Sequence, residues 1–121
     1  MSKTILIVED NEMNMRFFHD LLKVNGHGVL QTKDGREALT ITREKRPDLI
    51  IMDIQLPGLS GLEVTRMIKG DDELKAIPIV AVTALAMVGD KEKILQSGCD
   101  GYISKTVSAK LFLETVNKFV G

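Results

Sequence analysis

The sequence is short of the residues that stabilise disulfide-linked proteins and that stack on flavins. It contains a single cysteine and no tryptophan, and its other aromatic residues are one tyrosine and four phenylalanines. One cysteine excludes an intramolecular disulfide framework. No apolar run approaches the roughly 20 residues of a membrane-spanning helix, so we expect no membrane span. The phosphate-binding pattern G-x-x-x-x-G-K-[ST] is also absent, which argues against a P-loop NTPase.

An excess of charge of one sign is missing as well. The chain has 16 basic and 17 acidic residues and a formal net charge of −1. We therefore expect no binding to nucleic acid through bulk electrostatics. The 121 residues, 44% of them hydrophobic, fit one globular domain. Residues 1–4 lead directly into an apolar run and leave no room for a signal peptide, so we predict a single cytoplasmic domain over residues 1–121.

What the chain does contain is a regular alternation of short apolar runs and amphipathic segments. The apolar runs predict strands over residues 5–8, 28–32, 48–53, 78–82 and 101–104. The amphipathic segments predict helices that begin after Asn11 and Ser108 and that cover residues 35–46, 62–69 and 90–96. Five strand–helix units predict an α/β fold, with a parallel sheet covered by helices on both faces. Right-handed crossovers favour the doubly wound strand order 2-1-3-4-5.

Polar residues stand at the ends of four of these strands. Glu9 and Asp10 follow the first strand, Asp53 ends the third, Thr83 follows the fourth and Lys105 follows the fifth. Because the carboxyl ends of parallel strands meet at one edge of a sheet, we expect these side chains to converge there. Three carboxylates, a hydroxyl and an ammonium suit a divalent metal ion and a phosphoryl group.

The three carboxylates predict a magnesium site. Packed together without a cation they would repel one another, and a pKa would rise. Mg²⁺ offsets that repulsion and takes one or two protein carboxylates together with phosphate and water. We expect Asp10 and Asp53 to be direct ligands and Glu9 to hold a coordinated water. The backbone carbonyl of Gln55 completes the predicted set.

An aspartate can also act as a nucleophile and form an aspartyl-phosphate. We predict this role for Asp53. Lys105 would neutralise charge on the transferring phosphoryl oxygens. The Thr83 hydroxyl would bond a phosphoryl oxygen, and the small Ala84 would leave access to the site.

The residues around these positions resemble a known family. The strings are 8–11 (VEDN), 52–57 (MDIQLP) with Gly61, 82–84 (VTA) and 102–105 (YISK). They resemble the motifs of bacterial response-regulator receiver domains, over essentially the whole chain. The resemblance implies a flavodoxin-like fold and phosphorylation of Asp53 by a histidine kinase or histidine phosphotransfer protein. The strings 9–14 and 53–57 are most similar to those of stand-alone receivers that control bacterial cell division and cell fate.

The resemblance also implies a switch. Thr83 would shift towards the phosphoryl group, and Tyr102, otherwise a half-buried strand aromatic, would rotate inward. The fourth helix, fifth strand and fifth helix would then present a changed face to downstream proteins, together with the apolar residues 85–88. The first helix would dock the kinase. The chain ends after its last predicted helix, so we expect no output domain, and no catalysis beyond assistance to its own phosphorylation and dephosphorylation.

Three alternatives stay open. Within the family, the chain fits a phosphorelay intermediate that passes the group to another histidine, or a piece of a longer DNA-binding regulator. From a different class comes a flavodoxin-like electron carrier. The acidic loop 9–11 disfavours the last, because it would repel the phosphate of FMN.

One position departs from the family pattern. Lys105 is followed by Thr106, where the family usually has a proline with a cis peptide bond. A cis bond before a residue other than proline costs about 2.5–4 kcal/mol. We therefore expect a trans bond and a shifted or more mobile Lys105.

Overall fold

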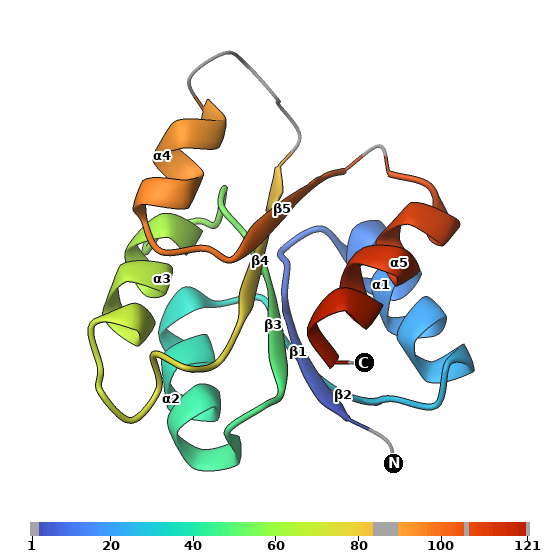
Figure 1. Ribbon diagram of the computed structural model, residues 1–121, viewed down its shortest axis with the longest axis horizontal. Coiled ribbons are helices and arrows are strands. Elements are labelled where there is room, and N and C mark those ends of the chain that lie inside the picture. Colours follow the sequence, from blue (N-terminus) through green and yellow to red (C-terminus); the bar gives the residue numbers. More distant parts are fainter. Residues whose placement is uncertain (1–2, 84–89, 106, 121) are drawn as a thin grey trace.

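Strands and helices alternate along the chain (Figure 1). The computed structural model describes residues 3–83, 90–105 and 107–120, without the side chains of residues 90 and 91. The strands in these ranges are β1 (Thr4–Val8), β2 (Gly28–Thr32), β3 (Leu49–Asp53), β4 (Ile79–Thr83) and β5 (Gly101–Ser104). The helices are α1 (Glu12–Val24), α2 (Gly35–Lys45), α3 (Gly61–Lys69), α4 (Asp90–Gln96) and α5 (Ala109–Val120).

The strands form one parallel sheet in the order β2-β1-β3-β4-β5, which confirms the predicted topology. β4 lies one residue later than predicted and includes Thr83. Pro78 has no N–H to donate and accepts a bond from the Ile50 N–H through its carbonyl, at 3.0 Å. At the other end, the N–H of Lys105 donates to the Thr83 carbonyl at 2.8 Å. The pairing of β4 and β5 therefore holds the backbone as far as Lys105.

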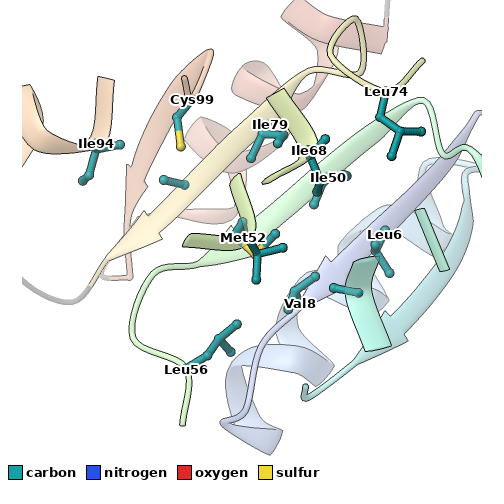
Figure 2. Close-up of a cluster of buried hydrophobic side chains, with 13 residues drawn as sticks. Leu6, Val8, Ile50, Met52, Leu56, Ile68, Leu74, Ile79, Ile94 and Cys99 are labelled. Carbon is teal, nitrogen blue, oxygen red and sulfur yellow. The ribbon is translucent and has the colours of Figure 1, made fainter. Parts of the chain in front are cut away.

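Helices cover both faces of the sheet, as predicted. α1 and α5 lie on one side, and α2, α3 and α4 lie on the other (Figure 1). On the first side, Phe18 of α1 stacks on Phe112 of α5 with ring centroids 4.7 Å apart. On the second side, Leu6, Ile50 and other strand residues meet apolar side chains of the three helices (Figure 2). Burial on both faces explains why the three inner strands, β1, β3 and β4, are continuous apolar runs.

The helix ends follow local signals in the sequence. The Asn11 side chain caps α1 by accepting from the N–H of Asn14 at 3.0 Å, and Ser60 caps α3 by accepting from Glu63 at 3.3 Å. The helix predicted to end at Arg46 ends at Lys45, because Arg46 adopts a left-handed conformation (φ 45°). The next residue is a proline, which disfavours α conformation in the residue before it. No described helix is long and apolar enough to span a membrane.

Candidate functional site

The carboxyl edge of the sheet brings together side chains that are distant in the sequence. Nζ of Lys105 lies 3.1 Å from Oδ2 of Asp53 and 3.3 Å from Oε2 of Glu9. These residues come from the ends of β5, β3 and β1, three different strands. The two carboxylate side chains are almost completely buried, with 1% of each exposed. The predicted convergence of Glu9, Asp53 and Lys105 is therefore present.

Asp10 joins the two buried acids. Glu9, Asp10 and Asp53 each offer a carboxylate oxygen within 4.8 Å of the other two. Asp10 is exposed, so the cluster opens to solvent on its side. Oε1 of Glu9 is buried and has no hydrogen-bond partner among the described residues. A buried, unpaired carboxylate oxygen is costly unless a cation or a coordinated water satisfies it, so the residues fit a magnesium ion.

The electrostatics of the site reflect this crowding of acids. Burial, together with a hydrogen bond to Asp53, raises the pKa of Glu9 to about 7. Burial also acts to raise the pKa of Asp53, but hydrogen bonds with Glu9, the Gln55 N–H and Lys105 outweigh it and hold that pKa below its usual range. Crowding of the two carboxyl groups thus favours a shared proton at this site when no cation is bound, with the pKa of Glu9 raised and that of Asp53 lowered.

The two acids also shift the pKa of Lys105. Burial acts to lower the pKa of Lys105, but the hydrogen bond and charge of Asp53 and the charge of Glu9 raise it above the ordinary value. The side chain is therefore a permanent cation beside Asp53. Two carboxylates lie beside its ammonium, and its backbone N–H donates to the Thr83 carbonyl. The shifted or more mobile Lys105 that we expected stays a prediction. The Lys105–Thr106 peptide lies outside the described residues.

The remaining predicted residues lie at the same edge. The N–H of Gln55 donates to Oδ1 of Asp53 at 2.9 Å, which places this backbone beside the acid cluster. Thr83 ends β4 with 2% of its surface exposed, and it pairs in register with Ser104. Tyr102 of β5 has 37% of its surface exposed, which agrees with the half-buried strand aromatic that we expected. Ala84 and residues 85–88 lie outside the described ranges.

The structure adds one contact beside the site that the sequence does not signal. Nζ of Lys33, in the loop after β2, lies 2.6 Å from Oε1 of Glu12, the first residue of α1. Both side chains are exposed, and their positions in the sequence differ by 21. No periodic pattern relates two such positions, because the pair depends on how α1 packs beside β2.

The chain matches the family model described as response regulator receiver domain over residues 5–117. It is 55% identical to the polar-differentiation response regulator DivK of Brucella anthropi and 54% identical to that of Brucella ovis. Each alignment spans 100% of this chain and 98% of the relative. The predicted similarity to stand-alone cell-division receivers is therefore confirmed.

Solved structures agree in fold. The receiver domain of a sensor histidine kinase from Pseudomonas aeruginosa, which holds a magnesium ion coordinated in its active site cleft, is 33% identical, with a TM-score of 0.92. That similarity covers 100% of this chain and 99% of the other. A response regulator from Chloroflexus aurantiacus is 25% identical, with a TM-score of 0.94 over 98% of each chain. The buried acids, their lysine and the likeness of the whole chain lead to one conclusion: this protein belongs to the family of response regulator receiver domains.

Proposed function

We propose that this protein is a stand-alone response regulator that accepts a phosphoryl group on Asp53 in two-component signalling. The observation that carries the proposal is the pairing of a buried, ionised Asp53 with Lys105 inside a cluster of acids. A histidine kinase or a histidine phosphotransfer protein would donate the group. In this reaction an oxygen of Asp53 bonds to phosphorus, and the bond from phosphorus to the donor's histidine nitrogen breaks.

The chain's own residues prepare this transfer. Gln55 and Lys105 each bond one oxygen of Asp53, so its carboxylate is held in a fixed orientation. Lys105 supplies a positive charge for the phosphoryl oxygens, and the Thr83 hydroxyl donates a hydrogen bond to one of them. The same groups would assist hydrolysis of the aspartyl-phosphate. The protein is therefore a phosphoacceptor and not an enzyme that acts on a separate substrate.

The acid cluster is proposed to hold Mg²⁺. Asp10, Asp53 and the backbone carbonyl of Gln55 would be direct ligands, and Glu9 would hold a coordinated water. When bound, the ion neutralises charge on the phosphoryl group during transfer. The unpaired oxygen of Glu9 supports this assignment, and so does the magnesium ion in the Pseudomonas receiver.

The proposed output surface consists of α4, β5 and α5. Tyr102 and Leu111 are exposed there, and they line a groove of about 500 Å³ together with Val107. We infer that phosphorylation draws Thr83 towards the phosphoryl group and that Tyr102 turns inward into the space so released. Downstream proteins would distinguish the two states by the change on this face, as ligands do when they bias a two-state equilibrium.

The cellular role follows from the relatives. Because they are named polar-differentiation response regulators, we infer that this chain acts in the cytoplasm in control of the cell cycle and cell division. The kinase or phosphotransfer protein would dock on α1, where Met13 and Phe17 are exposed. A flavodoxin-like electron carrier is disfavoured by the acids of the loop after β1.

Labelling of Asp53 tests the proposal. The purified protein is incubated with acetyl phosphate and Mg²⁺, and the Asp53→Asn variant is treated in parallel. We expect alkali-labile phosphate on the wild type and none on the variant, and chelation of Mg²⁺ should abolish labelling. Label retained by Asp53→Asn would contradict the assignment of the acceptor. Addition of a histidine phosphotransfer protein then separates a terminal regulator from a phosphorelay intermediate, because only the intermediate passes the group on.

A further inference from the structure

The first residue of α3 lies directly against the backbone of Asp53. A Cβ atom placed on Gly61 would be 2.0 Å from the carbonyl oxygen of Asp53 and 2.7 Å from Cα of Ile54. Carbon atoms in favourable contact are about 3.5–4.0 Å apart, so no side chain fits here. The φ angle of Gly61 is not positive, unlike those of Gly26, Gly58 and Gly98. Gly61 is thus required by proximity and not by its backbone conformation.

Both partners of this contact are held in place. On the helix side, Val64 and Ile68 are completely buried, and the Thr65 hydroxyl donates to the Gly61 carbonyl at 2.8 Å. On the strand side, the Ile54 N–H donates to the carbonyl of Val82 at 3.2 Å. The Gly61 N–H in turn donates to the Ile54 carbonyl at 3.3 Å. An added methyl group must therefore displace either a packed helix or the end of β3.

The end of β3 carries the geometry of the site. The two oxygens of Asp53 bond the Gln55 N–H at 2.9 Å and Nζ of Lys105 at 3.1 Å. Both distances depend on where the backbone of residues 53–55 lies. We propose that Gly61 is a positioning residue. Because it has no side chain, α3 can pack in van der Waals contact with the backbone of Asp53. This contact sets the position of the Asp53 carboxylate and of the Gln55 backbone relative to Lys105 and the other acids. This inference rests on the proposed function.

Gly35 offers a matched control. A Cβ atom there would lie 2.8 Å from the Leu59 carbonyl oxygen and 2.9 Å from Cγ2 of Val64. It would therefore crowd the same loop and the same helix as a side chain at Gly61, but its nearest contacts include no atom of Asp53 or Ile54. Gly28 is a neutral control, because its Cβ atom would meet Thr4 at 3.6 Å, an ordinary contact.

The test compares the variants Gly61→Ala, Gly35→Ala and Gly28→Ala with the wild type. All samples contain trimethylamine N-oxide, which favours folded states, and circular dichroism verifies folding. Calorimetry measures the dissociation constant of Mg²⁺, and labelling with acetyl phosphate at saturating Mg²⁺ measures the rate. For Gly61→Ala we expect Mg²⁺ affinity to fall by roughly 10- to 100-fold. We expect the rate to fall by roughly 100-fold, as for a displacement of about 1 Å. The other two variants should stay close to the wild type.

Several results would overturn the inference. One is a folded Gly61→Ala protein with the Mg²⁺ affinity and rate of the wild type. Another is an equal loss in Gly35→Ala, which would reveal a general effect of crowding on the loop. A third is a Gly61→Ala protein that stays unfolded under these conditions, because the fold and not the site would then require the glycine.

The proposed function can fail separately. A wild-type protein that accepts no label would contradict the proposed phosphorylation of Asp53. The inference about Gly61 would still be tested by an NMR measurement that needs no phosphorylation. In metal-free protein, the amide NMR signals of Ile54 and Gln55 should move in Gly61→Ala and stay in place in Gly35→Ala. Unmoved signals in Gly61→Ala would overturn the positioning role.

Discussion

Lys105 and Asp53 form an ion pair between strands that are not neighbours in the sheet. Nζ of Lys105 lies 3.1 Å from Oδ2 of Asp53, and β4 lies between the strands that carry them. The same ammonium contacts Glu9, so one cation links the ends of three strands. Because the two acids are buried, the protein without metal depends on this lysine to balance their charge.

Replacement of Lys105 by glutamine should therefore lower both the stability of the protein and the rate of its proposed phosphorylation. A buried acceptor that loses its partner costs about 1–3 kcal/mol, and more when it is charged. Denaturant unfolding of the metal-free variant should show a loss of this size, and NMR titration should show a higher pKa of Asp53. Lys75→Gln is the control, because its pair with Asp72 is exposed and exposed pairs contribute little. An equal effect of both substitutions would argue against the role of Lys105.

The raised pKa of Glu9 predicts a dependence of stability on pH. The folded protein keeps a proton on Glu9 up to about pH 7, whereas the ordinary pKa is 4.5. The folded state thus binds more protons than the unfolded state between these values, so the free energy of unfolding should fall as pH rises through this window. The loss should be of the order of 3 kcal/mol, since one pKa unit corresponds to about 1.4 kcal/mol.

Denaturant unfolding at several pH values measures this effect. In Glu9→Gln the decline should disappear, because the amide does not titrate. Saturating Mg²⁺ should also suppress it in the wild type, since a cation stabilises the ionised form. Titration of Asp53 has the opposite effect on stability. Because its pKa is lowered in the folded state, the free energy of unfolding should fall as the pH drops below its ordinary pKa of 3.8. A decline that persists in Glu9→Gln would show that another group is responsible.

Removal of the exposed acid of the cluster should separate metal binding from folding. Asp10 is exposed, so Asp10→Asn should leave the stability of the metal-free protein nearly unchanged. Mg²⁺ at about 100 times its dissociation constant should stabilise the wild type by about 2.7 kcal/mol. We expect thermal unfolding to show little of this gain in Asp10→Asn. Asp72→Asn, a highly exposed acid away from the cluster, should keep the full gain.

Substitution of Lys69 should have the converse effect, a loss of stability without a loss of Mg²⁺ binding. Its Nζ donates to the carbonyls of Lys75 and Ile77 and to Oδ2 of Asp100, which also accepts from the N–H of Ile79. These bonds join α3 to the starts of β4 and β5, at the edge of the sheet opposite the site. Lys69→Met should lower the free energy of unfolding by about 3 kcal/mol.

The Mg²⁺ affinity of Lys69→Met should equal that of the wild type when both are folded. Arg46→Gln, which removes an exposed ion pair with Glu73, should change neither quantity. Weaker Mg²⁺ binding in folded Lys69→Met would mean that the two edges of the sheet are coupled.

The sequence was sufficient to predict the strand order and the convergence of the acids. Strands buried on both faces are continuous apolar runs, and the polar residue that ends each run marks the carboxyl edge. Glu9, Asp53 and Lys105 were predictable for this reason. Element ends shifted by one residue at Arg46 and Thr83, where a left-handed cap and a ladder bond decide the boundary.

Other features depend on three-dimensional packing and have no recognisable pattern in the sequence, so they could not be predicted from it. The apolar periodicity of α3 does not indicate that Lys69 makes three hydrogen bonds. The steric role of Gly61 is hidden too, because a glycine at the start of a helix ordinarily indicates nothing about what lies beneath it.

The strand order has a consequence for how such a protein can diversify. Among the strands that the structure describes, β3, which ends in Asp53, has a bonded strand on each side, whereas β5 pairs with β4 alone. On the proposed output surface, substitutions on the outer side of β5 and along α5 would alter the choice of binding partner while the ladders around the central strand persist. The proposed acceptor chemistry and the specificity of the response would therefore be open to separate change.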